Sequence, residues 1–169
     1  MQFALILIAT TVLGACFGAL RDGLLNLGVP EYFQTDREWV LLAGAATWGS
    51  FGVILGLGLA CAARLGRRPK RTARDLRRPI LFLLAVIAGF SLLAGVIGAI
   101  ATSFGLRVLP PEVYDRLPPP TWAGLHFCWF VQIMGNYVGF VAGGMQVAWV
   151  WVSRKRLAGR RSKSVSTSG

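Results

Sequence analysis

ILFLLAVIAGFSLLAGVIGAIATSFGL, residues 80–106, decides the fold, because these 27 residues contain no Asp, Glu, Lys or Arg. An α-helix needs about 20 apolar residues to cross the roughly 30 Å hydrocarbon layer of a bilayer. Three further segments without charged residues meet this requirement, at residues 2–20, 39–63 and 122–152. The sequence therefore predicts an all-α, polytopic membrane protein, a four-transmembrane-helix bundle formed by one domain at residues 1–157.

The charges between these segments predict an orientation. Eight basic residues and one acidic residue lie between Arg64 and Arg78, and six basic residues and no acidic residue lie between Arg154 and Lys163. Residues 21–38 carry two basic and four acidic residues, and residues 107–121 carry two of each. Because cytoplasmic loops are enriched in Lys and Arg, both termini and the loop around Arg71 are expected in the cytoplasm, with the protein in the cell's inner (plasma) membrane.

The net charge of +11 also raises the question of nucleic-acid binding. The basic residues alternate with the predicted crossings, however, so attraction to anionic lipid headgroups at 64–78 and 154–163 is a sufficient explanation. We therefore expect membrane lipids, and no nucleic acid, as partners of these segments. The basic, Ser-rich tail at 158–169 is expected to be disordered.

The first segment and the cysteines have simple interpretations. The run from Leu13 to Cys16 loosely resembles a lipoprotein cleavage site, but no positively charged region precedes it and the apolar run continues to Leu20. We therefore keep the segment as a membrane helix. The three cysteines, Cys16, Cys61 and Cys128, are too few and scattered for a disulfide framework or a zinc cluster, and packing between helices is expected for them.

One face of the last predicted helix is polar. At about 100° per residue, one arc of this helix collects Gln132, Gly135, Asn136, Gly139, Gly143 and Gln146. Lipid offers amides no hydrogen bonds, so this arc is expected to face the bundle. Interhelical hydrogen bonds are favoured for the amides over contacts to a substrate or quinone.

His126 is the only histidine, and it lies near the external end of this helix, away from the polar arc. A metal ligand, a haem ligand and a proton relay are the functional interpretations. Its predicted depth and off-face position favour an ordinary side chain at the membrane interface.

Arg21 and Asp22, with Glu31 and Tyr32, form a second candidate site at the external end of the first helix. Charges at a helix end usually meet water, which is the simpler interpretation. Glu31 lies in an apolar stretch, however, where a carboxylate needs a partner, and Arg21 is near enough in sequence to be that partner.

The segments Phe17-Gly18-Ala19-Leu20-Arg21-Asp22 and Glu31-Tyr32-Phe33-Gln34 resemble a family of uncharacterised bacterial four-helix membrane proteins. The run from Asn136 and Tyr137 to Gly139, and the run from Val150 to Arg154, are similar to the last helix of that family. The resemblance implies the same architecture, but it implies no activity. Arg21 and Ile133 replace the family's two histidines, so any metal site that relatives hold there is expected to be lost, whereas Asp22, Glu31, Tyr32 and Tyr137 carry over.

Three classes of function follow. The leading hypothesis is a non-enzymatic accessory or assembly subunit, or a self-associating bundle, that binds a protein partner or a second copy through the external surface around Asp22–Phe33. The alternative is binding or transport of a lipid or small apolar molecule, through the polar face with Gln132 and Asn136. A membrane metal or redox enzyme is the third and least favoured class, because no nucleophile–base pair and no second histidine are present. The sequence identifies no cofactor.

Overall fold

The computed structural model describes residues 1–33, 36–66 and 69–166, with side chains as far as Arg156. Every element in this part of the chain is helical. The four long helices are α1 (Gln2–Gly28), α3 (Arg37–Arg64), α4 (Ala73–Ser103) and α6 (Trp122–Ser166), and the short elements are α2 (Pro30–Phe33), α5 (Pro111–Arg116) and η1 (Pro119–Thr121). Each long helix contains a span long and apolar enough to cross a bilayer. The predicted four-helix membrane architecture is confirmed.

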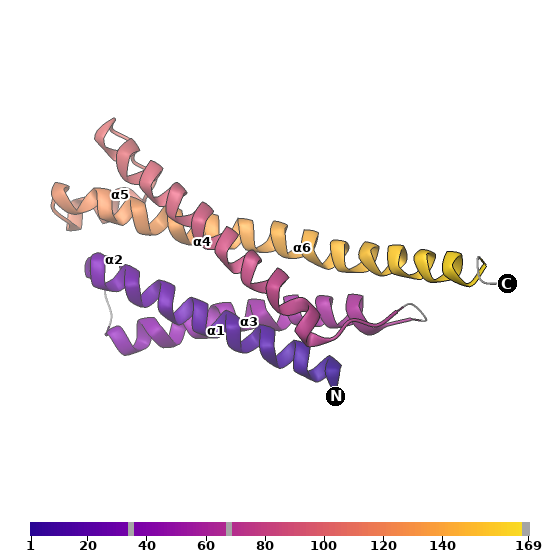
Figure 1. Ribbon diagram of the computed structural model, residues 1–169. Coiled ribbons are helices and arrows are strands. Elements are labelled where there is room, and N and C mark those ends of the chain that lie inside the picture. Colours follow the sequence, from indigo (N-terminus) through magenta and orange to yellow (C-terminus); the bar gives the residue numbers. More distant parts are fainter. Residues whose placement is uncertain (34–35, 67–68, 167–169) are drawn as a thin grey trace.

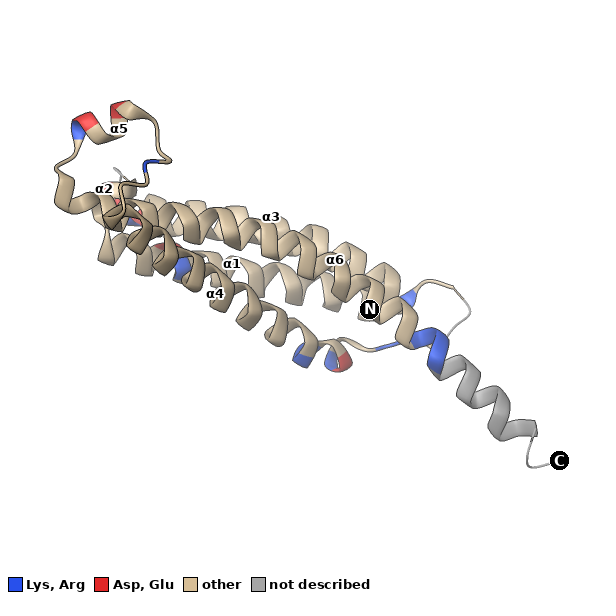
Figure 2. Cartoon of the chain, turned by 90° about the horizontal axis from the view of Figure 1, so that it is seen from above, with Lys and Arg blue, Asp and Glu red and all other residues tan. Residues whose placement is uncertain are grey.

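Successive long helices run in opposite directions, so the connections alternate between two ends of an elongated bundle (Figure 1). The α5 end carries α2 and α5. The basic end carries the N-terminus, the α3–α4 loop and the residues from Arg154 to Arg156. Figure 2 shows Lys and Arg gathered at the basic end, whereas the α5 end carries both signs of charge.

Helices α1 and α3 form a closely packed antiparallel pair, because glycines bring their backbones together. A Cβ on Gly18 would lie closer than 3 Å to the backbone carbonyl of Gly44, and a Cβ on Gly44 would meet the carbonyl of Gly18. The same holds for Gly14 against Trp48 and Gly52 against Thr10. Hydrocarbon solvent provides no hydrophobic force between helices, so such close backbone packing is a main source of association.

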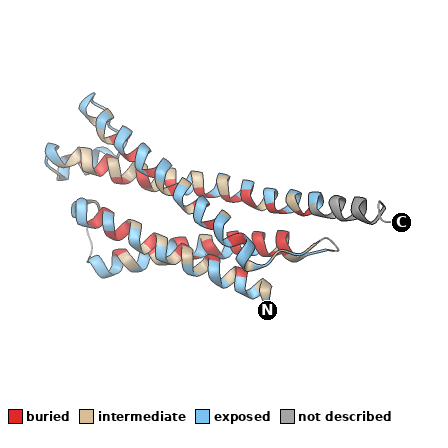
Figure 3. Ribbon diagram, viewed as in Figure 1, coloured by how far each residue is buried: buried red, intermediate tan, exposed pale blue. Residues whose placement is uncertain are grey.

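Helix α4 crosses the bundle obliquely (Figure 1). Near the α5 end, Gly95 and Gly98 of α4 lie against aromatic rings of α6, those of Phe127 and Phe130. Near the basic end, α4 instead joins the main buried cluster, which contains Leu76, Ile80, Leu83 and Ile87 of α4 with Ile6, Leu59, Ala63 and Val150. The buried residues therefore form inward stripes, while the outward faces are exposed along the length of the bundle (Figure 3).

The helices differ in length from the predicted segments. Helix α1 continues past Arg21 and Asp22 to Gly28, since these two residues neutralise each other and need not mark the membrane boundary. Helix α4 starts at Ala73 instead of 80, with Thr72 and Asp75 forming a reciprocal capping box and Pro79 inside the helix. Pro79 is the seventh residue of α4, so it lies beyond the first turn and removes the helical hydrogen bond to the Asp75 carbonyl.

The segment at 107–121 is partly helical, although its Pro-rich composition favours an extended path. It contains the helical turns α5 and η1, and both begin at prolines, whose fixed φ suits the first position of a helix. At the other end, α6 continues to Ser166. The prediction of a disordered tail at 158–169 falls on residues whose side chains, or for 167–169 the whole residues, lie outside the described part, so it stays a prediction.

Candidate functional site

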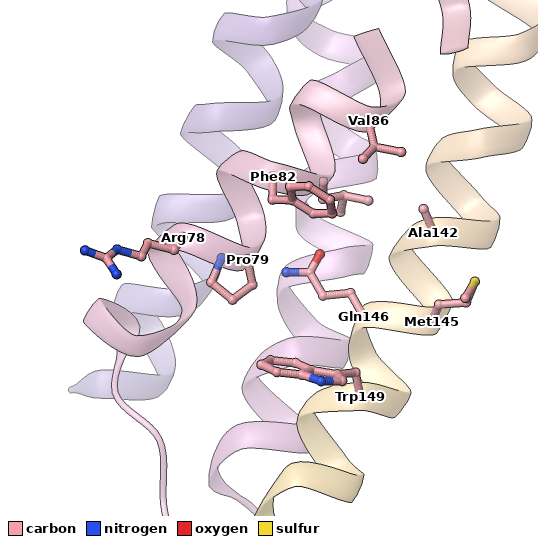
Figure 4. Close-up of a pocket in the computed structure, with 9 residues that line it drawn as sticks. Arg78, Pro79, Phe82, Val86, Ala142, Met145, Gln146 and Trp149 are labelled. Carbon is pink, nitrogen blue, oxygen red and sulfur yellow. The ribbon is translucent and has the colours of Figure 1, made fainter. Parts of the chain in front are cut away.

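A cleft of about 560 Å³ lies between α4 and α6 in the half of the bundle near the basic end. Its wall is apolar, with Phe82, Leu83 and Val86 from α4 and Ala142 and Met145 from α6. The amide of Gln146 reaches from α6 toward α4 into this space, with the Trp149 ring below it (Figure 4). We call this space the inner cleft.

Gln146 is the polar group inside the inner cleft. Only 9% of its surface is exposed, and neither its Nε2 nor its Oε1 has a hydrogen-bond partner. An unpaired buried amide costs about 1–3 kcal/mol in proteins. The site therefore offers both a donor and an acceptor to an occupant that has an apolar body and polar atoms.

Cationic side chains lie at the mouth of the inner cleft. Arg78 belongs to the lining and its guanidinium turns away from α6 (Figure 4). The Arg71 guanidinium lies over the Trp149 ring, 5.2 Å from its centroid, and the Arg71 Nε is buried without a partner. Positive charge at the mouth and an apolar interior form an amphipathic site.

The residues of the predicted polar face of α6 differ in burial. Gly135, Gly139, Gly143 and Gln146 are buried, whereas Asn136 and Tyr137 are exposed and Gln132 is half-buried. Within the described residues, no hydrogen bond to Gln132, Asn136 or Tyr137 is present. The expectation that the whole arc faces the bundle is therefore wrong for Asn136, which lines a groove beside Thr47 and Ser50 of α3.

Arg21 and Asp22 form an ion pair inside the bundle. The Arg21 Nε and Nη2 donate to the Asp22 Oδ1, each at 2.7 Å, and the Asp22 side chain is only 9% exposed. Glu31 is exposed, so the predicted pairing of Arg21 with Glu31 is wrong. The Asp22 carboxylate already compensates the Arg21 cation, so no second carboxylate is needed for neutrality.

The third nitrogen of the Arg21 guanidinium, Nη1, is buried and has no partner. The guanidinium lies over the Trp48 ring, 5.0 Å from its centroid, and the buried Trp48 Nε1 also lacks a partner. A Cβ on Gly135 would lie 3.1 Å from both the Arg21 Nη1 and the Ser91 Oγ. Beside them, a cavity of about 180 Å³ is lined by Arg21 and Ser91 and otherwise by apolar side chains of α1, α4 and α6.

Tyr32 is half-buried against the small apolar cluster of Leu25, Cys128 and Val131. Burial raises the pKa of the Tyr32 phenol to about 12, and negative charge at Cys128 and Asp22 would add to this effect. Of the four residues in the predicted external site, Arg21, Asp22 and Tyr32 thus turn inward, and only Glu31 remains on the surface.

His126 is fully buried, in a hydrogen-bond network that the prediction of an ordinary side chain at the membrane interface did not include. It joins three elements: its Nδ1 lies 3.0 Å from the Thr102 Oγ1 of α4 and 3.0 Å from the Trp122 carbonyl of α6. Its Nε2 lies 2.8 Å from the Tyr114 hydroxyl of α5. No sequence pattern points to this network, because its members are separated by loops rich in proline.

The partners assign the tautomer of His126. The Leu109 N–H donates to the Tyr114 oxygen at 3.0 Å, which leaves the Tyr114 O–H to donate to the His126 Nε2. The Thr102 hydroxyl donates to the Gly98 carbonyl at 2.9 Å, so its oxygen can accept from the His126 Nδ1–H. The imidazole is therefore neutral and both nitrogens are satisfied, which is the arrangement of a structural tie.

Arg154 is another side chain whose position the sequence did not predict. It is fully buried, and its guanidinium donates to the carbonyls of Ala62, Leu65 at 2.9 Å and Pro69 at 2.8 Å. These carbonyls end α3 and continue into the following loop, where a cation is stabilised by the helix dipole. Arg154 therefore does not face lipid headgroups as predicted.

The cysteines and acidic residues form no further centre. All three cysteines are free, with Cys16 exposed and Cys128 buried. In the part of the chain that the structure describes, no three His, Cys, Asp or Glu side chains come together as metal ligands.

Comparisons of the chain with models of protein families, with characterised proteins and with solved structures found no match. The resemblance to the bacterial four-helix family therefore stays a prediction. Inferences about function rest on the inner cleft and the buried polar groups.

Proposed function

We propose that this chain is a non-enzymatic membrane protein that binds one anionic phospholipid in the inner cleft. The observation that carries the proposal is the Gln146 amide, nine-tenths buried between apolar walls with both polar atoms unpaired. A buried polar group without a partner is rare in native proteins. A bound molecule that supplies the missing hydrogen bonds explains why the amide is there.

The order of groups along the inner cleft matches the order of groups along a phospholipid. The Arg71 guanidinium lies over the Trp149 ring at the mouth, where a phosphate would sit at the headgroup level, whereas the Arg78 guanidinium turns away from α6 (Figure 4). The Gln146 amide lies deeper, at the level of the ester carbonyls, and Phe82 and Val86 line the path of an acyl chain. Attraction of about 1 kcal/mol per basic residue near the surface favours an anionic headgroup.

The orientation belongs to the same proposal. We place the basic end in the cytoplasm and the α5 end outside the plasma membrane, because the positive-inside bias opposes the reverse arrangement. The inner cleft then opens to the cytoplasmic leaflet, whose anionic lipids supply the ligand. Cysteine labelling by a membrane-impermeant reagent at a residue introduced in α5 and at one introduced beside Lys155 tests this orientation.

The lipid is tested by native mass spectrometry after purification in mild detergent and exchange with phosphatidylglycerol or phosphatidylcholine of the same acyl composition. We expect one retained phospholipid per chain, with phosphatidylglycerol preferred. The substitution Gln146→Leu should weaken retention about tenfold, the equivalent of losing one to two hydrogen bonds. It should also stabilise the lipid-free chain, because it removes the unpaired amide.

Gln132→Leu is the matched control, since Gln132 lies on the same helix but does not line the inner cleft. Retention by this variant should stay within twofold of the wild type. Equal retention by the Gln146 and Gln132 variants contradicts the role of the inner cleft. Arg71→Gln should reduce the preference for phosphatidylglycerol while lipid is still retained, and an unchanged preference contradicts the role of the cations.

A further inference from the structure

A second set of unpaired buried donors lies in the other half of the bundle, away from the inner cleft. It consists of the Arg21 Nη1 and the Trp48 Nε1, neither of which has a hydrogen-bond partner. We call these two N–H groups the donor cluster. The Ser91 hydroxyl lies beside them, and it already donates to the Ile87 carbonyl at 2.6 Å. Trp48 and Ser91 are each 2% exposed, so water outside the bundle does not reach them.

Gly135 lets the backbone of α6 approach the donor cluster closely. A Cβ there would lie 3.1 Å from both the Arg21 Nη1 and the Ser91 Oγ, which is tighter than ordinary contact, and 3.4 Å from the Trp48 Cζ2. That indole carbon is two bonds from the Trp48 Nε1. The unpaired Arg21 N–H of α1 and the indole edge of Trp48 of α3 thus lie next to the same position beside the backbone of α6.

Arg21 and Ser91 also line a cavity that has a lateral route to lipid. This cavity of about 180 Å³ is lined by Leu20 and Leu24 of α1 and Leu92 of α4, and all three side chains are more than half exposed on the outer surface. The remainder of the lining is apolar apart from Arg21 and Ser91. An apolar molecule can therefore enter from the bilayer between α1 and α4 without crossing water.

The charges define the ligand. Arg21 is already neutralised by Asp22, so a carboxylate would bring an uncompensated negative charge into a low-dielectric site. An uncharged carbonyl oxygen has two lone pairs for the free N–H groups and brings no net charge. Its hydrogen bond to a guanidinium is stronger than one between neutral groups.

We propose that the donor cluster binds the uncharged carbonyl oxygen of an apolar molecule that enters between α1 and α4. A membrane quinone and a fatty ester share this chemistry. The proposal concerns binding only, and it is independent of the phospholipid in the inner cleft, because the two sites share no lining residue.

The test uses the full chain in nanodiscs of ether-linked phosphatidylcholine, whose lipids carry no ester carbonyls to compete. Decylubiquinone is the quinone probe, methyl palmitate the ester probe and palmitate the charged comparison. Binding is measured by tryptophan fluorescence or equilibrium partition, and the infrared carbonyl stretch reports hydrogen bonding. We expect saturable binding of one carbonyl probe per chain, with its carbonyl stretch shifted to lower frequency.

Gly135→Ala is the decisive variant, because its Cβ would press on the Arg21 Nη1 and the Ser91 Oγ while all charges stay in place. It should weaken binding about tenfold, the effect expected for loss of a hydrogen bond to a charged group. Gly139→Ala, one turn along α6, is the control, since its Cβ would make only ordinary contacts of 3.4 Å or more with Phe51 and Trp48. Its binding should stay within twofold of the wild type.

The outcomes separate the ligand from its alternatives. Preference for decylubiquinone or for methyl palmitate identifies which carbonyl source the site accepts, and either supports the proposal. Non-saturable uptake that is equal in all variants means that the donors are satisfied by water, and it overturns the proposal. Tighter binding of palmitate than of both carbonyl probes overturns the assignment of an uncharged ligand.

Discussion

Replacement of Arg154 by Gln should destabilise the whole bundle, although the residue lies in a basic segment expected to face headgroups. The guanidinium donates to the carbonyls of Ala62, Leu65 and Pro69, which joins the end of α3 and the α3–α4 loop to α6. Hydrogen bonds to a charged group contribute about 1.5–3 kcal/mol each. Three such bonds, less the cost of burying the cation, amount to a net loss of about 3 kcal/mol.

Unfolding by SDS in mixed micelles, followed by circular dichroism, measures this difference. Lys155→Gln is the matched control, because Lys155 is the exposed neighbour and exposed charges contribute at most about 1 kcal/mol. Arg154→Lys should fall between the two, since a lysine keeps the charge but cannot reach three carbonyls with a planar fork. If the free energies of unfolding of the Gln variants at 154 and 155 agree within about 0.5 kcal/mol, the Arg154 hydrogen bonds do not stabilise the bundle.

Two further substitutions test packing and the buried histidine. Gly18→Ala should destabilise the bundle by about 1–3 kcal/mol, because its Cβ would collide with the Gly44 carbonyl. Gly89→Ala, with no atom near its Cβ, is the control and should be neutral or slightly stabilising. Equal unfolding midpoints of the two variants in the same SDS assay would count against close α1–α3 packing. His126→Phe should make the 107–121 segment at the α5 end more sensitive to proteolysis, because the Tyr114 hydroxyl and the Thr102 oxygen lose their shared hydrogen-bond partner. Tyr114→Phe should have a smaller effect in the same direction. A proteolysis rate unchanged in both variants would contradict a structural role of His126.

The four spans are predictable from sequence because the length of an uncharged apolar run is fixed by the thickness of the bilayer. Their ends are less predictable, because a charged residue marks a boundary only when it needs water. Arg21 and Asp22 neutralise each other within α1, and Arg154 finds three carbonyls within the bundle. In both places a charge that looked like a membrane boundary is satisfied by the protein itself.

The candidate sites could also be predicted only in part. The helical period correctly places Gly135, Gly139, Gly143 and Gln146 on one buried face of α6. Asn136, the neighbour of Gly135, is exposed. An arc of about 100° is wider than the strip of α6 that contacts its neighbours, so side chains at its edges can lie outside the bundle. Periodicity thus identifies a face, but which amides lie inside it depends on the crossing angle of the neighbouring helix.

That crossing angle accounts for both proposed sites at once. Helix α4 contacts α6 closely near the α5 end, where Gly95 and Gly98 meet aromatic rings, and joins the buried cluster with α1 and α3 near the basic end, where Leu76 and Ile80 are buried. Helix α4 crosses the bundle obliquely (Figure 1), and a space lies beside it at two places. The inner cleft opens where α4 has left α6, and the cavity at the donor cluster opens where α4 has left α1. Each space lies beside buried polar atoms without partners, and this is the reason for proposing a ligand at each.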